Sequence, residues 1–330
     1  MSKPIHIVFT PDRRFLPGLH VTAYSVLANC KKPVYFHIFA DSLTEQDIAL
    51  LEETLRETKR PFQLEVHKMQ TEIFAHLPPM LGSLAIYYRL VVPELLPVDR
   101  FVYVDIDTVC GLDLSELLNV EMNGAPAGLV PEAPLASAVD RFVADQLGNS
   151  PREPYFNAGL ILVNVAEWRR QKIAEESVKY IATHRPAFHD QAALNFVLHR
   201  KAFALDAKFN CIANMRKNWP ALLAAYGNTG KLIHFLDYPK PWDFLGEFVH
   251  PQYGLWRSVL NKTAMRHFRS WQATPARKFP KTRKAWSGYK KALKDRLLFA
   301  GYSKGWLKNV KGVTDEKQKT ENRNGESSGQ

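Results

Sequence analysis

The sequence predicts an α/β fold with a mainly parallel central sheet that is covered by helices on both faces. Short apolar runs rich in β-branched residues alternate with segments of helical periodicity from Ile5 to Phe235. Polar residues suited to chemistry follow several of these runs, at the strand ends where sheets of this class bind ligands. The chain contains neither a GxGxxG motif nor a P-loop, which disfavours a Rossmann dinucleotide-binding domain.

The first elements follow from local pattern. Residues 5–10 (IHIVFT) are apolar and β-branched and are followed by Pro11 and Asp12, which predicts a strand that ends in a turn. Residues 19–27 have helical periodicity, and residues 34–40 (VYFHIFA) predict a second strand.

A second helix is expected to begin at Thr44, with Asp47 at its third position and an apolar face formed by Leu50, Leu51 and Leu55. Further apolar runs predict strands at residues 62–67, 101–104, 159–163 and 232–235. Strands that alternate with helices predict parallel pairing, because the crossover helices return the chain to the same end of the sheet.

Composition limits the protein class. The chain has 330 residues, 46% hydrophobic and 23% charged, as in soluble globular proteins. No run approaches the ~18 apolar residues of a membrane helix, and the first residues do not resemble a secretory signal. The chain has three widely spaced cysteines, Cys30, Cys110 and Cys211. They suit a reducing compartment and form the pattern of neither a disulfide framework nor a zinc site. A cytoplasmic protein is expected.

The positive charge is concentrated near the end of the sequence. Residues 262–311 contain 15 Lys and Arg but one acidic residue, a net charge of +14, whereas the whole chain carries +11. We therefore expect three parts: a near-neutral catalytic domain (1–261), a basic arm (262–311), and a disordered tail (312–330) with almost no apolar content.

The arm has the pattern of a basic amphipathic helix. Its aromatic and aliphatic stripe recurs at helical spacing and consists of Trp286, Tyr289, Leu293, Leu297 and Ala300. Lysines and an arginine lie on the other faces of this helix. Attachment to an anionic membrane surface is the favoured interpretation. A helix packed on the body and a nucleic-acid contact are the alternatives. The near-neutral body argues against nucleic acid, which is not expected as a partner.

Two carboxylates follow the apolar strand at residues 101–104. Asp105 and Asp107 are two residues apart, so in extended chain their side chains point to the same side. Like charges held together are unfavourable unless a cation lies between them. A divalent ion that prefers oxygen ligands, Mn²⁺ or Mg²⁺, meets this need and also binds a diphosphate.

A second group of polar residues follows the strand at residues 232–235. His234 and Lys240 share one loop, stiffened by two prolines, that ends at Trp242. An imidazole can ligate a metal, and a lysine offers a compact positive charge to phosphate.

Taken in order, these motifs resemble the family 8 glycosyltransferases, retaining enzymes of the GT-A fold, and especially the bacterial lipopolysaccharide galactosyl- and glucosyltransferases. The resemblance extends from about Ile5 to Trp242. It rests on IVFTPD before a helix with Ser25-Val26, Tyr88-Arg89-Leu90, Asp105-Ile-Asp107, Phe156-Asn157-Ala158-Gly159 before a strand and Asn164, Asp190-Gln191 with Asn195, and His234 with Lys240-Pro-Trp242.

The resemblance implies a role for each matching residue. Asp105, Asp107 and His234 would be the metal ligands, and Lys240 would bind phosphate and offset the charge of the leaving group. The remaining positions would contact the donor: Thr10 and Asp12 at the uracil end, and Arg89, Asp105, Asn157 and Asp190 at the sugar. Gln191 lies where the family places a side chain on the β-face of the anomeric carbon.

The resemblance also implies the reaction, which is retaining transfer of galactose or glucose from a UDP-hexose to a glycan or lipid-linked glycan. Gln191 is a poor nucleophile, so we favour front-face transfer, in which the leaving phosphate oxygen accepts the acceptor's proton. A covalent intermediate on Asp190 is the alternative. The basic arm would attach this cytoplasmic enzyme peripherally to the inner face of the membrane.

Three positions depart from the family pattern. Asp237 replaces the glycine usual between His234 and the lysine, Glu132 lies where relatives often carry a sugar-binding aspartate, and Arg13-Arg14 follow Asp12 where relatives often have Asp and Asn. Two rival functions stay open: a metal-dependent nucleotide-sugar hydrolase or nucleotidyltransferase, and a non-catalytic relative that binds sugar or membrane.

Overall fold

The computed structural model describes residues 3–80, 82–213, 230–236, 239–250, 252–272 and 289–290. Its strands are β1 (Ile5–Phe9), β2 (Val34–Ala40), β3 (Phe62–Lys68), β4 (Arg100–Val104), β5 (Thr108–Cys110), β6 (Ala127–Pro134), β7 (Pro154–Asn164), β8 (Phe203–Ala204), β9 (Cys211–Ile212) and β10 (Leu232–His234). Its helices are α1 (Leu16–Asn29), α2 (Glu45–Arg56), α3 (Tyr88–Leu95), α4 (Arg141–Gln146), α5 (Val165–Arg170), α6 (Ile173–His184), α7 (His189–Val197), α9 (Gly246–Val249) and α10 (Tyr253–Leu260).

The chain forms two compact units. The first contains residues 1–236 and 254–269, and the second contains residues 237–253 and 270–330. Residues 262–269, expected to open the basic arm, belong to the first unit, where Thr263 is fully buried and the Ala264 amide donates to Thr54. Most of the arm and all of the tail lie outside the described residues.

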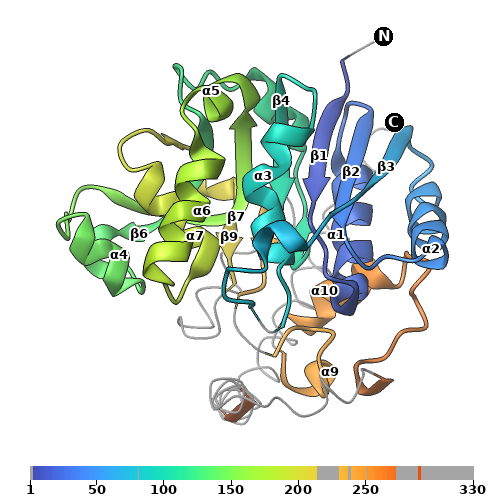
Figure 1. Ribbon diagram of the computed structural model, residues 1–330. Coiled ribbons are helices and arrows are strands. Elements are labelled where there is room, and N and C mark those ends of the chain that lie inside the picture. The colour runs from blue at the N-terminus through green and yellow to red at the C-terminus, as the bar shows by residue number, and fades with distance from the viewer. Residues whose placement is uncertain are drawn as a thin grey trace, which may run out of the picture. The chain divides into compact units, whose positions relative to one another are not determined.

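The first unit is built on a seven-stranded sheet of order β3-β2-β1-β4-β7-β6-β8 (Figure 1). The β1–β2, β2–β3, β1–β4 and β6–β8 pairs are parallel, whereas β7 runs antiparallel to both β4 and β6. The expected α/β fold with a mainly parallel sheet is confirmed. The antiparallel β7 brings its own residues beside the carboxyl end of β4.

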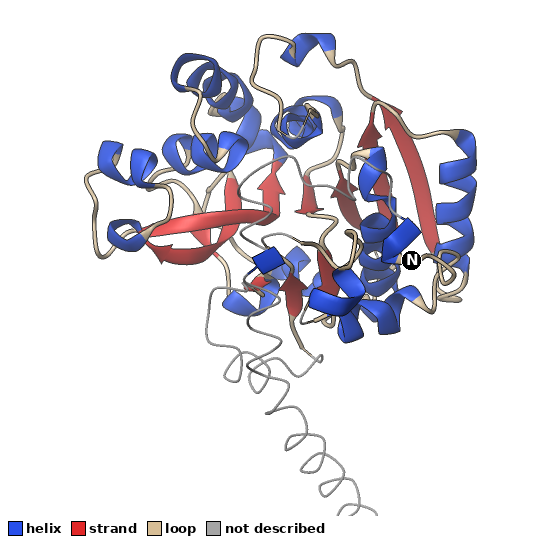
Figure 2. Cartoon of the chain, turned by 90° about the horizontal axis from the view of Figure 1, so that it is seen from below, coloured by secondary structure: helices blue, strands red, loops and turns tan. Residues whose placement is uncertain are grey.

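Two apolar cores lie on opposite faces of this sheet. Helices α1 and α2 pack on one face through alternate residues of β1, such as Ile5 and Ile7. Helices α3, α5, α6 and α7 pack on the other, against residues such as Val8 and Tyr103. Figure 2 shows the strands as a layer with helices on both sides. Strand periodicity of two thus divides the apolar residues between the two cores.

The expected elements are present, and the strand expected at residues 159–163 begins five residues earlier, at Pro154. The helix at Thr44 has the expected cap: the Thr44 hydroxyl accepts from the Asp47 amide, and the Asp47 carboxylate accepts from the Thr44 amide. The strand expected at residues 232–235 lies in a separate sheet of order β5-β10-β9, in which β10 is antiparallel to β5. This pairing places the end of β10 beside the segment that follows β4.

No helix among the described residues combines the length and the apolar character that crossing a membrane requires.

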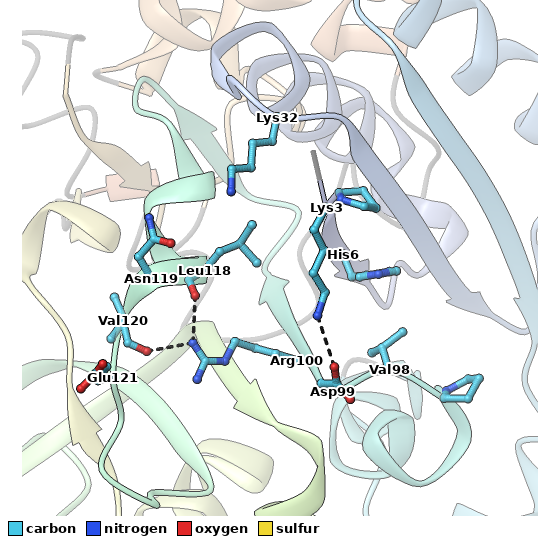
Figure 3. Close-up of a pocket in the computed structure, with 12 residues that line it drawn as sticks. Lys3, His6, Lys32, Val98, Asp99, Arg100, Leu118, Asn119, Val120 and Glu121 are labelled. Carbon is cyan, nitrogen blue, oxygen red and sulfur yellow. Dashed lines mark hydrogen bonds and ion pairs between the residues drawn. The ribbon is translucent and has the colours of Figure 1, made fainter. Parts of the chain in front are cut away.

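A cavity of about 750 Å³ opens at the opposite end of the sheet from the ends of β1 and β4. Figure 3 shows that Lys3 is ion-paired with Asp99 and that Arg100 donates to the carbonyls of Leu118 and Val120. Because Arg100 begins β4, it lies about 16 Å of extended chain before the carboxylates that follow that strand. This cavity is therefore separate from the expected site.

A buried histidine in α1 makes the fold sensitive to acid. His20 is fully buried, and its Nδ1 lies 2.7 Å from the Thr54 hydroxyl. Burial lowers the pKa of His20 from 6.5 to about 4. The unfolded chain therefore binds a proton that the folded chain lacks, and the associated stability is present above pH 6.5 and lost as the pH falls toward 4.

We expect about 3 kcal/mol of unfolding free energy to be lost through His20 over this range, at about 1.4 kcal/mol per pKa unit. Urea unfolding at pH 7 and pH 4.5 measures the loss, which should be smaller in His20→Gln. The exposed His184 provides the control, since His184→Gln should keep the full pH dependence. Equal pH dependence of wild type and His20→Gln would contradict the assignment.

Candidate metal centre and sugar site

Three possible metal ligands come together where β4 ends. Asp105 and Asp107 follow β4, and His234 ends β10, where it pairs with Thr108 of β5. His234 Nε2 lies 3.1 Å from Asp107 Oδ1 and 3.8 Å from Asp105 Oδ2. The imidazole is buried, while the two carboxylates are partly exposed. The sequence-predicted trio is thus brought together by two sheets.

A chain of amides fixes the imidazole of His234. The backbone amide of Gly159 donates to Asn157 Oδ1 at 2.9 Å, which leaves the Asn157 Nδ2 group to donate to Glu132. Asn210 Nδ2 then donates to Asn157 Oδ1 at 2.8 Å, and Asn210 Oδ1 lies 3.0 Å from His234 Nδ1. This order assigns the proton to Nδ1 of His234. Its Nε2 lone pair therefore faces the two carboxylates.

Asp105 has a different set of partners on each of its two oxygens. Oδ1 accepts from the Tyr103 hydroxyl at 2.7 Å and from Arg89 at 2.8 Å, while Oδ2 lies on the side of His234. The Arg89 guanidinium also lies over the Tyr103 ring, 4.3 Å from its centre. The carboxylate is thereby held in one orientation with one oxygen directed at the candidate metal position.

Arg89 joins this carboxylate to a second one. It extends from α3, donates to the Ala158 carbonyl and lies 3.1 Å from Asp190 of α7. Burial opposes the charge on Arg89, but Asp105 and Asp190 raise its pKa. Burial raises the pKa of Asp190 despite the lowering effect of Arg89. Arg89 and Asp190, both predicted as sugar contacts, thus lie side by side next to Asp105.

Gln191 binds the same residue, Ala158, at its backbone amide. Its amide oxygen accepts from the Ala158 backbone amide at 3.1 Å, and its nitrogen is 3.3 Å from the Tyr155 hydroxyl. Asn195, one turn later on α7, donates to the Gln191 carbonyl and exchanges two hydrogen bonds with the backbone of Phe156. Helix α7 and strand β7 are therefore locked together around Ala158, and Gln191 is held beside Asp190.

The residues expected at the base end are Thr10 and Asp12, after β1. The Thr10 hydroxyl lies 3.2 Å from that of Tyr103, which connects it to Asp105. Burial opposes ionisation of Asp12, but Arg14 lowers the pKa of that carboxyl through backbone and side-chain hydrogen bonds. Asp12 therefore caps its own turn with the help of Arg14, and a uracil contact would have to share the carboxylate with that arginine.

Lys240 belongs to the second unit. Its side chain is buried, and its backbone amide donates to the Asp243 carboxylate at 2.7 Å. Gly246 lies so close to this turn that an added Cβ would be 2.7 Å from the Lys240 carbonyl and 2.4 Å from that of Pro241. The turn thus depends on a glycine at position 246. Asp237, the departure from the family pattern, lies outside the described residues.

The donor set fits a divalent cation. Asp105, Asp107 and His234 supply two carboxylate oxygens and an imidazole lone pair within one small volume. The guanidinium of Arg89 lies between the carboxylates of Asp105 and Asp190. Mixed oxygen and nitrogen ligands, with more oxygen than nitrogen, suit Mn²⁺ or Mg²⁺.

Two contributors to the site were not predicted from the sequence, Asn210 and Tyr103. Tyr103 could have been predicted, because side chains alternate along a strand. It lies in β4 two residues before Asp105 and so points to the same side. Asn210 ends a short turn before β9 and looks like an ordinary loop residue in the sequence. Its role becomes visible only through contacts with residues far away along the chain.

Asn210→Ala tests the amide chain. The variant removes the acceptor that holds the Nδ1 proton of His234, so we expect affinity for Mn²⁺ to fall about 10-fold to 100-fold. The electron paramagnetic resonance signal of free Mn²⁺ measures the binding. Asn119→Ala, at an exposed position, should bind as wild type does. Wild-type affinity in Asn210→Ala would show that His234 is oriented by something else.

Comparison with known sequences places this chain among sugar-transferring enzymes. It is 25% identical over 305 residues to a lipopolysaccharide 1,2-glucosyltransferase of Escherichia coli, covering 88% of this chain and 86% of that protein. It is 27% identical over 260 residues to the lipopolysaccharide 1,3-galactosyltransferase of Salmonella typhimurium, covering 76% of each chain.

A solved structure has the same fold. The galactosyltransferase LgtC, in complex with donor and acceptor sugar analogues, superposes with a TM-score of 0.65 at 22% identity and covers 78% of this chain and 96% of its own. The sequence profile described as glycosyl transferase family 8 matches residues 6–246, which include the whole carboxylate and histidine cluster. The chain therefore belongs to glycosyl transferase family 8.

Proposed function

We propose that the protein transfers galactose or glucose from a UDP-hexose to a glycan acceptor, with lipopolysaccharide core or another cell-surface oligosaccharide as the acceptor class. One observation carries this proposal: His234 Nε2 lies 3.1 Å from Asp107 Oδ1 and 3.8 Å from Asp105 Oδ2. Membership of the family and the two lipopolysaccharide glycosyltransferase relatives support it.

Asp105, Asp107 and His234 would hold Mn²⁺ or Mg²⁺. The ion would supply Lewis-acid stabilisation of the charge that develops on the departing diphosphate. Tyr103 and Arg89 keep Asp105 oriented for this role through its other oxygen. Lys240 would add a compact positive charge at the phosphates, in line with the matching motif.

The sugar would lie beside Arg89, Asn157 and Asp190. Gln191, held by the Ala158 amide, is a poor nucleophile, which favours front-face retaining transfer. In that reaction the bond from the anomeric carbon to the phosphate oxygen breaks, the acceptor oxygen bonds on the same face, and its proton passes to the leaving phosphate. A covalent route would use Asp190 as nucleophile, and the carboxylate would first have to leave Arg89.

A panel of UDP-sugars tests the reaction and identifies the donor. Incubation with Mn²⁺ should release hexose slowly from one UDP-sugar, UDP-galactose or UDP-glucose, and transfer it when a lipopolysaccharide core acceptor is added. Glycoside product supports the proposal. Sugar phosphate as product, from cleavage between the two phosphates of the UDP-sugar, would support the rival nucleotidyltransferase or hydrolase, and binding without turnover would support a non-catalytic relative.

The basic arm would attach the enzyme peripherally to the inner face of the membrane, where lipid-linked glycan is available from the cytoplasm. The net charge of +14 in residues 262–311 supports an anionic surface as the partner. Tyr289 belongs to the apolar stripe and is among the described residues. Its hydroxyl donates to the Phe244 carbonyl, and its side chain is only partly exposed. Tyr289 would therefore not belong to the membrane-facing part of the stripe.

Charge removal in the full chain tests this attachment. Changing Lys284, Lys290, Lys291 and Lys294 to glutamine should abolish sedimentation with phosphatidylglycerol vesicles and leave UDP-sugar hydrolysis intact. The matched control changes four exposed lysines of the first unit, Lys59, Lys68, Lys172 and Lys201, and removes the same charge. Equal loss of sedimentation in both variants would point to a general charge effect and overturn the assignment to the arm.

A further inference from the structure

A row of histidines crosses the first three strands of the sheet, on the face opposite α1 and α2. His6 of β1, His37 of β2 and His67 of β3 alternate with core residues that point to the other face. The parallel register sets His37 directly opposite Glu65, with His67 two residues further along β3, opposite Phe39. Three histidines and a carboxylate are thus gathered by the regular spacing of strands.

The three atoms closest together form a compact triangle. His37 Nδ1 lies 3.2 Å from His67 Nε2 and 3.7 Å from Glu65 Oε2, and His67 Nε2 lies 3.8 Å from the same oxygen. The centre of this triangle, in the plane of the three atoms, lies about 2.1 Å from each of them, which is the length of a zinc–ligand bond. The ligand atoms therefore already stand where a bound ion requires them.

Neighbouring residues hold each of these ligand groups. His6 Nδ1 lies 2.9 Å from His37 Nε2, so that the second ring nitrogen of His37 has a partner while Nδ1 faces the triangle. The Tyr35 hydroxyl donates to Glu65 Oε2 at 2.9 Å. The Phe39 ring stacks on His67 with centres 4.2 Å apart. Such outer partners are typical of metal sites, because they fix ring orientation and tautomer.

The triangle is also accessible. The side chain of Glu65 is 49% exposed and that of His67 is 25% exposed, whereas His37 is almost fully buried beneath them. His6, at the inner end of the row, lines the cavity of Figure 3. An ion from solvent can therefore reach the two outer ligands directly.

We propose that His37, Glu65 and His67 form a second metal site, specific for a first-row transition ion such as Zn²⁺ and separate from the Asp105–Asp107 centre. Two imidazoles and one carboxylate suit zinc, whereas the carboxylate-rich centre suits Mn²⁺ or Mg²⁺. Three protein ligands leave a fourth position for water or another ligand. Because β3 is the edge strand of the sheet, the ion would tie this edge to β2.

Zinc binding by the full chain tests the proposal. We would use Asp107→Asn, which weakens the first centre, and titrate Zn²⁺ against a chromophoric chelator. Adding His67→Phe should weaken zinc binding at least 100-fold, and the new ring can still stack on Phe39. Glu65→Gln, at an exposed position, provides a second ligand variant for the case that His67→Phe does not fold. Tyr35→Phe should weaken binding about 10-fold.

His76→Phe is the matched control, because His76 is exposed and outside the row. Zinc should also raise the thermal midpoint of Asp107→Asn but not that of Asp107→Asn/His67→Phe, since a ligand that binds only the folded state stabilises it. Equal zinc affinity in Asp107→Asn with and without Glu65→Gln or His67→Phe would overturn the proposal and leave a hydrogen-bonded imidazole row. UDP-sugar turnover with Mn²⁺ by His67→Phe tests the proposed function separately.

Discussion

Asp107→Asn is expected to lower UDP-sugar turnover about 100-fold to 1000-fold, the range found when one electrostatic contact to the transition state is removed. Asp107 supplies the carboxylate oxygen nearest to His234 Nε2, at 3.1 Å. The neutral amide keeps the size of the side chain but removes the charge that a divalent ion needs. Steady-state hydrolysis of the UDP-sugar over a series of Mn²⁺ concentrations measures the effect.

The concentration series separates metal binding from folding. Part of the lost activity should return at high Mn²⁺, because the other two ligands remain in place. Asp99→Asn is the control just before the same strand, where Asp99 is exposed and its ion pair with Lys3 is exposed to solvent and contributes little. Unchanged turnover by Asp107→Asn would remove the basis of the proposed transferase mechanism.

Gly159→Ala should disable the same centre without changing any ligand. A Cβ at Gly159 would lie 2.3 Å from Cε1 and 2.4 Å from Nδ1 of His234, and 2.9 Å from Asn157 Oδ1. His234 is buried and held by Asn210, so it cannot move aside without loss of this hydrogen bond. We expect activity to fall about 100-fold, the effect of a misplacement of about 1 Å.

The same substitution should also cost about 1–3 kcal/mol of unfolding free energy through overpacking. Urea unfolding and the Mn²⁺ dependence of turnover measure the two effects. Gly254→Ala is the matched control, because nothing lies within 4 Å of a Cβ at that position in α10. If Gly159→Ala bound Mn²⁺ as tightly as wild type, the position of His234 would not determine metal affinity.

The fold class and the centre of the site could be predicted because both depend on short-range pattern. Buried strands appear as apolar runs, and a pair of aspartates two residues apart at a strand end must share a side. The helix at Thr44 begins where its capping residues indicate. These features need no knowledge of which strands are neighbours.

Pairing between distant segments could not be predicted in this way. Strand β7 runs from Pro154 to Asn164, but only its apolar second half looked like a strand. Its first half pairs with β6 across a bulge near Val130. The bulge interrupts the alternation of inward and outward side chains by which a strand is predicted. Residues 232–234 form a separate sheet with β5. This pairing could not be predicted, because three residues carry too little pattern to specify a partner strand. Asn210 was not predicted because its contacts, with Asn157 and His234, are also between distant segments.

The shared guanidinium of Arg89 affects how variants at this site can be interpreted. A single cation serves two acids that are 85 positions apart in the chain, one beside the candidate metal and the other on α7. Its removal would leave both acids without their counter-charge at once. Kinetic losses in an Arg89 variant therefore cannot be ascribed to donor recognition alone. The activation free energies lost in an Arg89 variant and in an Asp105 or Asp190 variant will not add up to the loss in the double variant. Double-mutant cycles are needed to divide the effect between the two carboxylates.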